Sequence, residues 1–374
     1  MTDDRVARVG LSRLFEPGDT RLPRLVAQLG ATRVFELLRE EQDIAGAATD
    51  VAARLLELRP ERDLEEAAAR GIRFICPGDA EWPGGLDDLD VVEPLQGRGG
   101  APLGLWVRGS LSLGESAATS AAVVGSRSAT TYGTSVASDL AAGLAGGETT
   151  VVSGAAFGID QAAHRGALAM RGKTIAVLAC GVDRAYPSAH KELLDYIVDV
   201  GVVVSELPLG CSPTRYRFLA RNRVIAALSR GTVVVEAAVR SGALNTANWA
   251  QRLHRHVMGI PGPVTSAPSE GVHQLIRLRD ATLVTRAEDV LELLSPVGAN
   301  LSEEAQEPAR PRDLLSRREQ QVLDAVPVSQ GASLGSVART AGISPTEVGR
   351  ALRTLHGKGF VEESESRWRL AEQR

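Results

Sequence analysis

The sequence predicts an α/β fold built on a mostly parallel sheet, with a small helical domain before it and a module of three helices and a hairpin after it. Three observations lead to this prediction. From Ala121 onward, valine-rich runs alternate with stretches of helical periodicity, as in βαβ units. Residues 296–312 carry prolines, serines and charges without an apolar pattern, which indicates a linker. Helix-start signals then recur in residues 313–374.

The composition is that of a chain with two or three water-soluble domains. Of 374 residues, 44% are hydrophobic, and 42 basic side chains stand against 46 acidic ones. No run approaches the ~20 apolar residues of a membrane helix, and the start MTDDRVARVG lacks a signal-peptide pattern. We expect a cytoplasmic protein without a membrane partner. The odd, widely spaced Cys76, Cys180 and Cys211 favour neither a disulfide framework nor a metal site.

Charge is distributed unevenly along the chain. Residues 1–117 hold 14 basic and 21 acidic side chains, whereas residues 118–295 hold 17 and 14. The part that carries the predicted sheet is therefore the basic one. So small a surplus of basic residues on a large domain fits an ordinary solvated surface as well as a nucleic-acid partner. The placement of the arginines is the stronger evidence for or against nucleic-acid binding.

The first domain, residues 1–70, is predicted to be helical. The stretches LPRLVAQLG and RVFELLRE have apolar residues at helical spacing, and Gly30 between them suits a helix end. A further helix in DLEEAAAR is expected to end near Gly71. The second domain, 71–295, opens with strands in GIRFIC and LGLWVRG, and its core sheet is expected from about residue 118.

Six apolar runs are the predicted strands of that core sheet: AAVVG, TTVVSG, TIAVLACG, GVVVSE, GTVVVEA and HVMGIPG. The first five end in Gly, Ser or Glu, or continue into such residues. Because parallel strands end at one edge of the sheet, these residues should meet at its carboxyl edge. That edge is where doubly wound folds bind ligands.

The last domain, residues 313–374, shows a winged-helix pattern. Ser316 and Glu319 form a capping box before a first helix, and LGSVARTAG is a second helix. Ser344, Pro345 and Glu347 then supply the start of a third helix at the place of a recognition helix. FVEE and RWRL make a two-stranded wing. The polar candidates for contact on the third helix are Thr346, Glu347, Arg350, Arg353 and Lys358. A duplex-DNA role and a protein-contact role remain equally open for this domain.

Two turns after predicted strands have ligand-binding potential. VVGSRSATTYG contains neither GxGxxG nor a Walker loop, which disfavours dinucleotide or ATP binding. Ser126 and Arg127 could instead hold a phosphate, although an arginine on a glycine turn is often simply solvated. In SGAAFGIDQAAH, Gly154 precedes a helix with Asp160 and His164 on one face. Helix capping and packing are a more ordinary role for this pair than acid–base catalysis.

The densest signal is SPTRYRFLARNRVIAALSR. It interleaves arginines with aromatic rings, as single-stranded nucleic acid requires, because the cations neutralise phosphates while a ring stacks on a base. The alternative is an amphipathic helix with solvated arginines. The candidates for binding in this stretch are Arg215, Phe218, Arg221, Asn222 and Arg223.

The neighbouring stretch VEAAVRSGALNTA adds polar residues to this edge. Ser241 and Gly242 are candidates for binding beside the arginines. Glu236 could pair with an arginine of the cluster or bind a ribose hydroxyl. Thr246 lies at the end of the same motif.

In this order and spacing, the motifs VVGSRSATTYG, VVSGAAFGIDQAAH, FLARNRVIAALS and VVVEAAVRSGALNTA resemble the DprA (Smf) family of DNA-processing proteins. The resemblance runs from about Ile72 through Leu294. It implies a Rossmann-like domain that binds single-stranded DNA, forms a homodimer and helps to load RecA in natural transformation. It implies no enzyme activity and no cofactor. The first domain is similar to the SAM-like or helix-hairpin-helix domain of many members.

The family pocket, carried over by motif, comprises Arg127, Gly154, Arg215, Phe218, Arg221 and Asn222. The chain departs from the family pattern after GIPGPV, where His273 replaces an asparagine and Arg279 stands where glycine is usual. This neighbourhood contributes to self-association in the family. We expect a dimer contact near residues 273–283, on the apolar pair Leu275 and Ile276.

The alternative function is that of an enzyme or sensor for nucleotide-like small molecules, because the same Rossmann variant resembles the LOG-type phosphoribohydrolases. In that case Ser126, Gly154 and Glu236 would hold a nucleotide. Those enzymes carry a PGGxGTxxE motif, and this chain has VEAAVRSGALNTA at the related place. A DNA-binding protein is therefore the leading interpretation.

Overall fold

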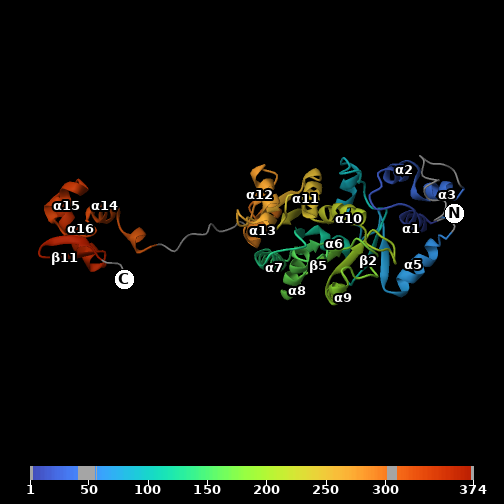
Figure 1. Ribbon diagram of the computed structural model, residues 1–374, viewed down its shortest axis with the longest axis horizontal. Coiled ribbons are helices and arrows are strands. Elements are labelled where there is room, and N and C mark those ends of the chain that lie inside the picture. The colour runs from blue at the N-terminus through green and yellow to red at the C-terminus, as the bar shows by residue number, and fades with distance from the viewer. Residues whose placement is uncertain (1–2, 41–54, 56, 301–309, 372–374) are drawn as a thin grey trace. The chain divides into compact units, whose positions relative to one another are not determined.

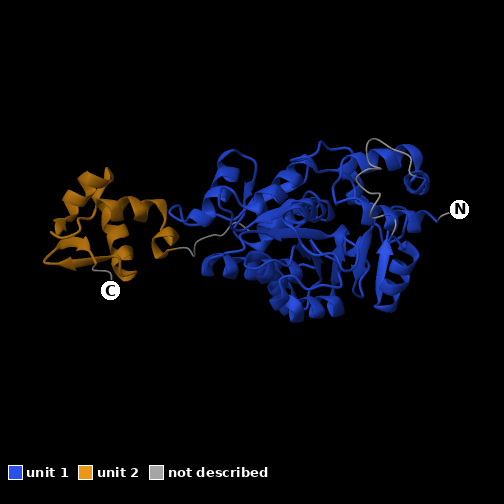
Figure 2. Ribbon diagram, turned by 45° about the vertical axis from the view of Figure 1, so that its right-hand side comes forward, with its two compact units in different colours: residues 1–302 blue, residues 303–374 orange. Residues whose placement is uncertain are grey.

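The computed structural model describes residues 3–40, 55, 57–300 and 310–371. The chain forms two compact units, Met1–Ser302 and Glu303–Arg374, which Figure 2 colours separately. Most of the predicted linker lies outside the described residues. Within the described ranges, every helix is too short or too polar to cross a membrane.

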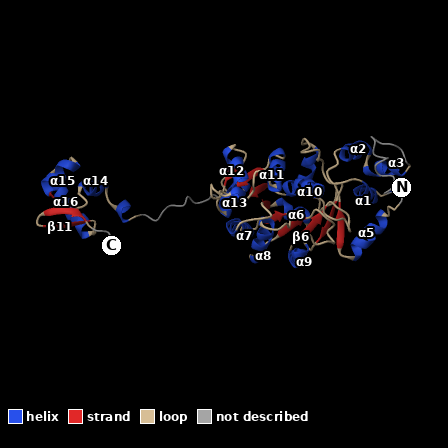
Figure 3. Cartoon of the chain, viewed as in Figure 1, coloured by secondary structure: helices blue, strands red, loops and turns tan. Residues whose placement is uncertain are grey.

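The first unit is organised around one mixed sheet (Figures 1 and 3). The strand order in the described residues is β1-β2-β6-β5-β4-β3-β7-β8-β9, and the strands from β6 to β9 run parallel. All six predicted core strands are present. The strands are β1 Ile72–Ile75, β2 Leu105–Arg108, β3 Ser120–Val124, β4 Thr150–Ser153, β5 Thr174–Val177, β6 Val202–Ser205, β7 Gly231–Val234, β8 His256–Gly259 and β9 Thr282–Leu283.

Helices cover both faces of the sheet, because each central strand is apolar on both sides. Ala122 and Val124 of β3 pack in a cluster with α10, α11 and α12, whereas Ala121 and Val123 pack with α7, α8 and α13. This alternation is the two-residue period of a strand. The Rossmann-like α/β class is confirmed. These helices are α6 Leu113–Ala118, α7 Thr131–Gly146, α8 Ile159–Ala169, α9 Lys191–Val200, α10 Arg215–Leu228, α11 Gly242–Arg252, α12 Glu270–Arg277 and α13 Ala287–Leu294.

The N-terminal helices pack on the β1 end of the same unit. The described helices there are α1 Asp4–Leu14, α2 Arg21–Leu29, α3 Ala31–Arg39 and α5 Pro60–Ala69. Gly30 separates α2 from α3 as predicted, whereas α1 was missed. The strands β1 and β2 pair antiparallel with each other, and β2 pairs antiparallel with β6, so the second domain's opening strands extend the core sheet. Arg5 of α1 binds Asp79 at 2.7 Å and joins the helices to the sheet.

Residues 273–283, where the sequence departs from the family pattern, pack differently from our expectation. Leu275 is buried and the partly buried Ile276 packs against the core, so most of the apolar pair expected at a dimer contact is used within its own subunit. The exposed apolar side chains nearby are Leu278 and Leu283, at 68% and 50%. Arg279 has a φ of 62°, in the left-handed region that favours glycine. This backbone conformation explains why glycine is usual at the position.

The second unit has the predicted order of three helices and a hairpin. These are α14 Arg317–Ala325, α15 Leu334–Ala341, α16 Pro345–Gly357, β11 Val361–Ser364 and β12 Arg367–Leu370. A short strand β10, Ala332–Ser333, also pairs with β12 and was not predicted. The capping box of Ser316 and Glu319 is present, and Ser344 caps α16.

Two of the polar candidates for contact, on α16 and at Lys358 directly after it, form ion pairs within the second unit. Lys358 binds Glu319 at 2.8 Å, and Glu347 lies 3.4 Å from Arg318. Arg350 and Arg353 remain exposed on the helix. The choice between a duplex-DNA role and a protein-contact role stays open for this unit.

Candidate nucleic-acid interface

A cleft of about 950 Å³ lies at the carboxyl edge of the core sheet. The turn after β3, the turn after β4, the first half of α10 and the turn from β7 into α11 line it. This is the edge at which the sequence placed a ligand. Seven of the ten predicted site residues contribute to the lining: Arg127, Arg215, Phe218, Arg221, Asn222, Ser241 and Gly242.

Helix α10 begins at the rim of the cleft. Thr214 caps it by accepting a hydrogen bond from the backbone N–H of Arg217. Arg215 then stands exposed in the first turn. With 3.6 residues per turn, Phe218 and Asn222 follow on the same face of the helix. One helix thus presents a cation, a ring and an amide to the cleft.

The ring of Phe218 is covered by charge in this structure. The Arg127 guanidinium carbon lies 4.2 Å from the ring centroid and that of Arg221 lies 6.0 Å away, both within cation–π range. Tyr186 tilts against the same ring at 5.7 Å and is 45% exposed. The aromatic platform therefore consists of the rings of Phe218 and Tyr186, and the Arg127 side chain lies over the Phe218 ring.

Arg221 is held beneath the cleft by backbone oxygens. Its Nη1 donates to the carbonyls of Gly154 at 2.8 Å and Val177 at 2.6 Å. Burial lowers the pKa of Arg221 to about 10 despite the nearby Asp160 carboxylate. The guanidinium is positively charged at neutral pH, and it is positioned rigidly.

Gly154 is needed for this arrangement, although it does not line the cleft itself. A Cβ atom at residue 154 would lie 1.9 Å from Arg221 Nη1. We expect Gly154→Ala to displace Arg221 and lower the free energy of unfolding by about 1 to 3 kcal/mol, as overpacking does. Urea denaturation measures this. Gly146→Ala is the matched control, because Gly146 has open space around it; an equal loss in both variants would contradict the expectation.

The opposite wall of the cleft is made of polar groups at the start of α11. Ser241 caps this helix and accepts from the N–H of Ala243. Asn222 Nδ2 donates to the Gly242 carbonyl at 3.2 Å and to Asn245 Oδ1 at 3.3 Å. These bonds orient the Asn222 amide. Ser241 thus starts α11, and the Gly242 carbonyl helps to hold Asn222.

The remaining predicted residues have structural positions. Ser126 joins the turn to the sheet, since its N–H donates to the Glu236 carbonyl at 2.7 Å and its carbonyl accepts from Ile159 N–H. The expectation for Arg223 requires correction. Its side chain is 1% exposed and binds Glu206 at 2.6 Å, away from the cleft lining. It is an internal ion pair and not a cation of the cleft.

Glu236 also differs from its predicted role. Its carboxylate is buried and accepts from the N–H of Thr130 at 2.9 Å and from the Thr130 hydroxyl at 2.5 Å. It therefore holds the start of α7. No arginine of the cluster pairs with it among the described contacts, and each of its oxygens accepts a hydrogen bond from Thr130.

Asp160 and His164 do not form a catalytic pair. Asp160 accepts from the N–H of Ala156 at 3.4 Å, and burial raises the pKa of its carboxyl. His164 lies fully buried with Nδ1 2.8 Å from the Thr174 hydroxyl, and burial lowers its pKa to about 3. The packing role is the one the structure supports. The cysteines are free thiols, and burial raises the pKa of Cys180 to about 11.

The cleft also contains a cation and an aromatic ring that the sequence did not predict as site residues, Arg240 and Tyr186. Arg240 is exposed in the cleft lining, directly before the Ser241 cap. Tyr186 lines it from the loop after β5, where the sequence analysis named no site residue. Both stand in segments without periodicity, so only the fold brings them to the site.

Comparison with known proteins gives this cleft its context. The sequence model of the family described as DNA recombination-mediator protein A matches residues 73–295, more than half of the chain. The chain belongs to this family. Its members named DprA or Smf include relatives in several bacteria, and the recombination-mediator role is that of the family.

Two relatives and two solved structures illustrate the similarity. A Mycobacterium tuberculosis protein with the name "Putative DNA processing protein DprA" is 43% identical over 96% of this chain and 92% of its own. The Streptococcus pneumoniae DprA is 44% identical over 51% of this chain and 66% of its own.

The structure of the S. pneumoniae DprA matches 78% of this chain and 97% of its own, with a TM-score of 0.63 and 32% identity. A Helicobacter pylori DprA structure, described for its single-stranded DNA binding mode, matches 59% of this chain and 95% of its own, with a TM-score of 0.50 and 26% identity.

Proposed function

We propose that the cleft binds single-stranded DNA with little dependence on sequence. The observation that carries the proposal is the combination of four arginines with an aromatic platform in one cleft: Arg127, Arg215, Arg221, Arg240, Phe218 and Tyr186. The cations neutralise phosphates, and stacking on a ring is tolerant of base identity. The DNA-binding mode described for the H. pylori relative supports the same proposal.

Binding would exchange partners on Phe218. In the structure Arg127 lies over the ring at 4.2 Å, where a stacked base would lie. A nucleobase would displace the guanidinium from the ring, and the freed Arg127 side chain would then bind a phosphate. The cation–π contact keeps the platform covered until a strand arrives.

We further propose that the protein helps RecA to assemble on DNA covered by single-strand-binding protein, as the family resemblance implies. The sequence has no Walker loop, so loading would use binding energy and local concentration and not a nucleotide. The cytoplasm is where these partners would meet.

A RecA assembly assay tests this function. We expect the full chain to shorten the lag before RecA filaments grow on coated single strands, and the Arg127→Ala/Arg215→Ala variant to have little effect. Tight DNA binding with an unchanged lag would contradict loading and leave strand protection as the function. Release of base from nucleoside monophosphates would instead favour the enzyme alternative, for which Glu236 is already occupied.

We also propose a homodimer through the edge of the sheet at β9. Leu283 is an exposed residue of this strand, and the exposed Leu278 precedes it. Among the described residues β9 is the edge strand and pairs only with β8. A symmetric contact would let the clefts of both subunits bind one DNA strand, which would raise the affinity for single-stranded DNA. Light scattering should report a dimer for the chain and a monomer for Leu283→Lys. A monomer at every protein concentration for the unaltered chain would refute the proposal.

A further inference from the structure

Helix α10 lines the cleft with one face and forms ion pairs with the other. Arg215, Phe218 and Asn222 face the cleft. The opposite face carries Arg217 and Arg223, which bind carboxylates elsewhere in the unit. The helical period of 3.6 residues separates the two sets. The ion pairs of Arg217 and Arg223 therefore anchor the helix on the side away from the cleft.

The first turn of this helix is tied to the N-terminal helical domain. Glu16, two residues after the end of α1, accepts from Arg217 Nε at 2.8 Å and Nη2 at 2.7 Å. Arg217 Nη1 also donates to the Ser212 carbonyl at 2.6 Å. A bidentate arginine–carboxylate pair fixes orientation as well as distance. This pair joins positions 201 residues apart in the sequence.

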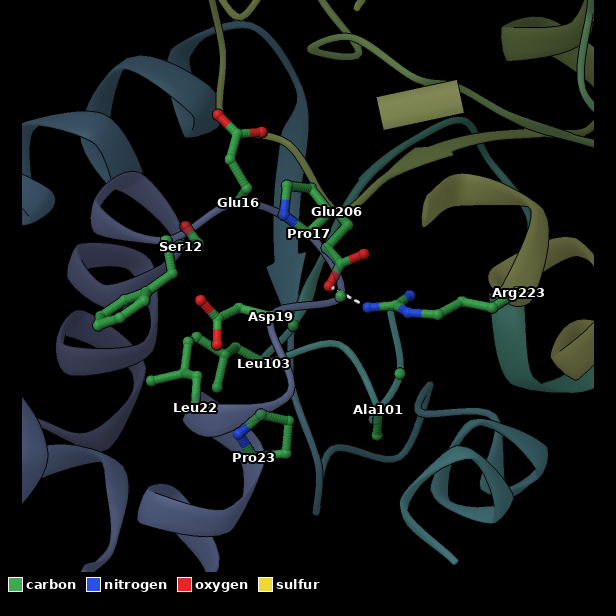
Figure 4. Close-up of a pocket in the computed structure, with 14 residues that line it drawn as sticks. Ser12, Glu16, Pro17, Asp19, Leu22, Pro23, Ala101, Leu103, Glu206 and Arg223 are labelled. Atoms are coloured by element: carbon green, nitrogen blue, oxygen red, sulfur yellow. Dashed lines mark hydrogen bonds and ion pairs between the residues drawn. The ribbon is translucent and has the colours of Figure 1, made fainter. Parts of the chain in front are cut away.

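The residues after Glu16 continue the contact along α10. Pro17 and Gly18 line a cavity of about 20 Å³ with Arg223 and Glu206 (Figure 4). Arg223 Nε and Nη1 have no protein partner there, and the space is large enough for one water. A second cavity of about 10 Å³ is lined by Pro17 together with Arg217 and Arg221. The N-terminal loop thus reaches the neighbourhood of a cleft arginine.

We infer that the N-terminal helical domain sets the DNA affinity of the cleft by positioning α10, with Glu16 as the positioning residue that acts through Arg217. The inference rests on the proposed single-stranded DNA binding. Arg215 and Phe218 lie in the first turn, where a helix frays most readily unless it is held. The Glu16 pair holds this turn from the side away from the DNA.

Reversing the charge of Glu16 distinguishes positioning from simple electrostatics. A new positive charge near the cleft should tighten DNA binding if long-range attraction alone mattered. Positioning predicts the opposite, a loss of about tenfold in affinity for Glu16→Arg, since a charge-assisted bidentate contact is broken. The Glu16→Arg/Arg217→Glu exchange rebuilds the pair and should recover the affinity to within about threefold.

The measurement is fluorescence anisotropy of a labelled oligonucleotide with the full chain. Glu65→Arg is the matched control, because it makes the same charge change on an exposed residue of α5. Glu16 is 43% exposed, and such pairs add little to stability, so the variants should unfold near the temperature of the unaltered chain. Glu16→Gln provides a second variant, which should also weaken binding.

Binding by Glu16→Arg that equals or exceeds that of Glu65→Arg, or an exchange variant no better than the single variants, overturns the inference. Absence of binding by the unaltered chain refutes the proposed function instead. The two failures are therefore distinguishable in one titration series.

Discussion

The Arg127→Ala/Arg215→Ala variant should bind single-stranded DNA about 100-fold more weakly at low salt. Each phosphate contact by an arginine is expected to contribute roughly 1.5 kcal/mol, and two are removed. Four arginines line the cleft, so log K should fall with log salt at a slope near −3 for the unaltered chain, taking about 0.7 per contact. The slope for the variant should be shallower by about 1.4. A salt titration followed by anisotropy measures both quantities.

Phe218→Ala should behave differently in the same titration. It removes a stacking surface worth roughly 1 to 3 kcal/mol per base and leaves the phosphate contacts in place. Affinity should fall while the salt slope stays nearly constant.

The control for the double arginine variant is Arg165→Ala/Arg230→Ala, which removes two exposed arginines outside the cleft. Equal losses in the two arginine variants would show that net charge, and not the cleft, governs binding. Equal affinity for duplex and single strands would count against the platform.

The largest effect on stability is expected for Glu206→Leu. This change leaves the Arg223 guanidinium, 1% exposed, without its carboxylate. An uncompensated buried charge costs about 3 to 5 kcal/mol. Replacing both partners, in Glu206→Leu/Arg223→Met, should restore most of this loss, because an apolar pair of similar volume needs no counter-charge.

Urea unfolding followed by tryptophan fluorescence measures this cycle. In a Trp368→Phe background the remaining tryptophans, Trp82, Trp106 and Trp249, all lie in the first unit and report on it alone. A double variant as unstable as the single one would mean that Arg223 has another essential partner. The double variant also tests the corrected role of Arg223, because its DNA salt slope should equal that of the unaltered chain.

Local signals in the sequence predicted much of the fold. The six core strands were predicted because buried parallel strands are continuous apolar runs, and Ser316 and Ser344 start helices as their capping chemistry requires. The helix α1, Asp4–Leu14, was not predicted, although Asp3 caps it by accepting from the N–H of Arg5. The sheet's antiparallel extension by β1 and β2 was also missed, since pairing order is not encoded within either strand.

By itself, the sequence determined that this protein has a parallel core sheet and an arginine-rich, aromatic helix at its ligand-binding edge, because strand burial, helix capping and turn chemistry act between near neighbours. Only the tertiary structure decided which arginines face the cleft. Arg215 stays exposed there, whereas Arg217 and Arg223 meet Glu16 and Glu206. The strength of an ion pair depends on the distance that the fold sets between its two charges. Arginines that look alike in one motif therefore differ in role, because carboxylates from distant parts of the chain pair with some of them and not with others.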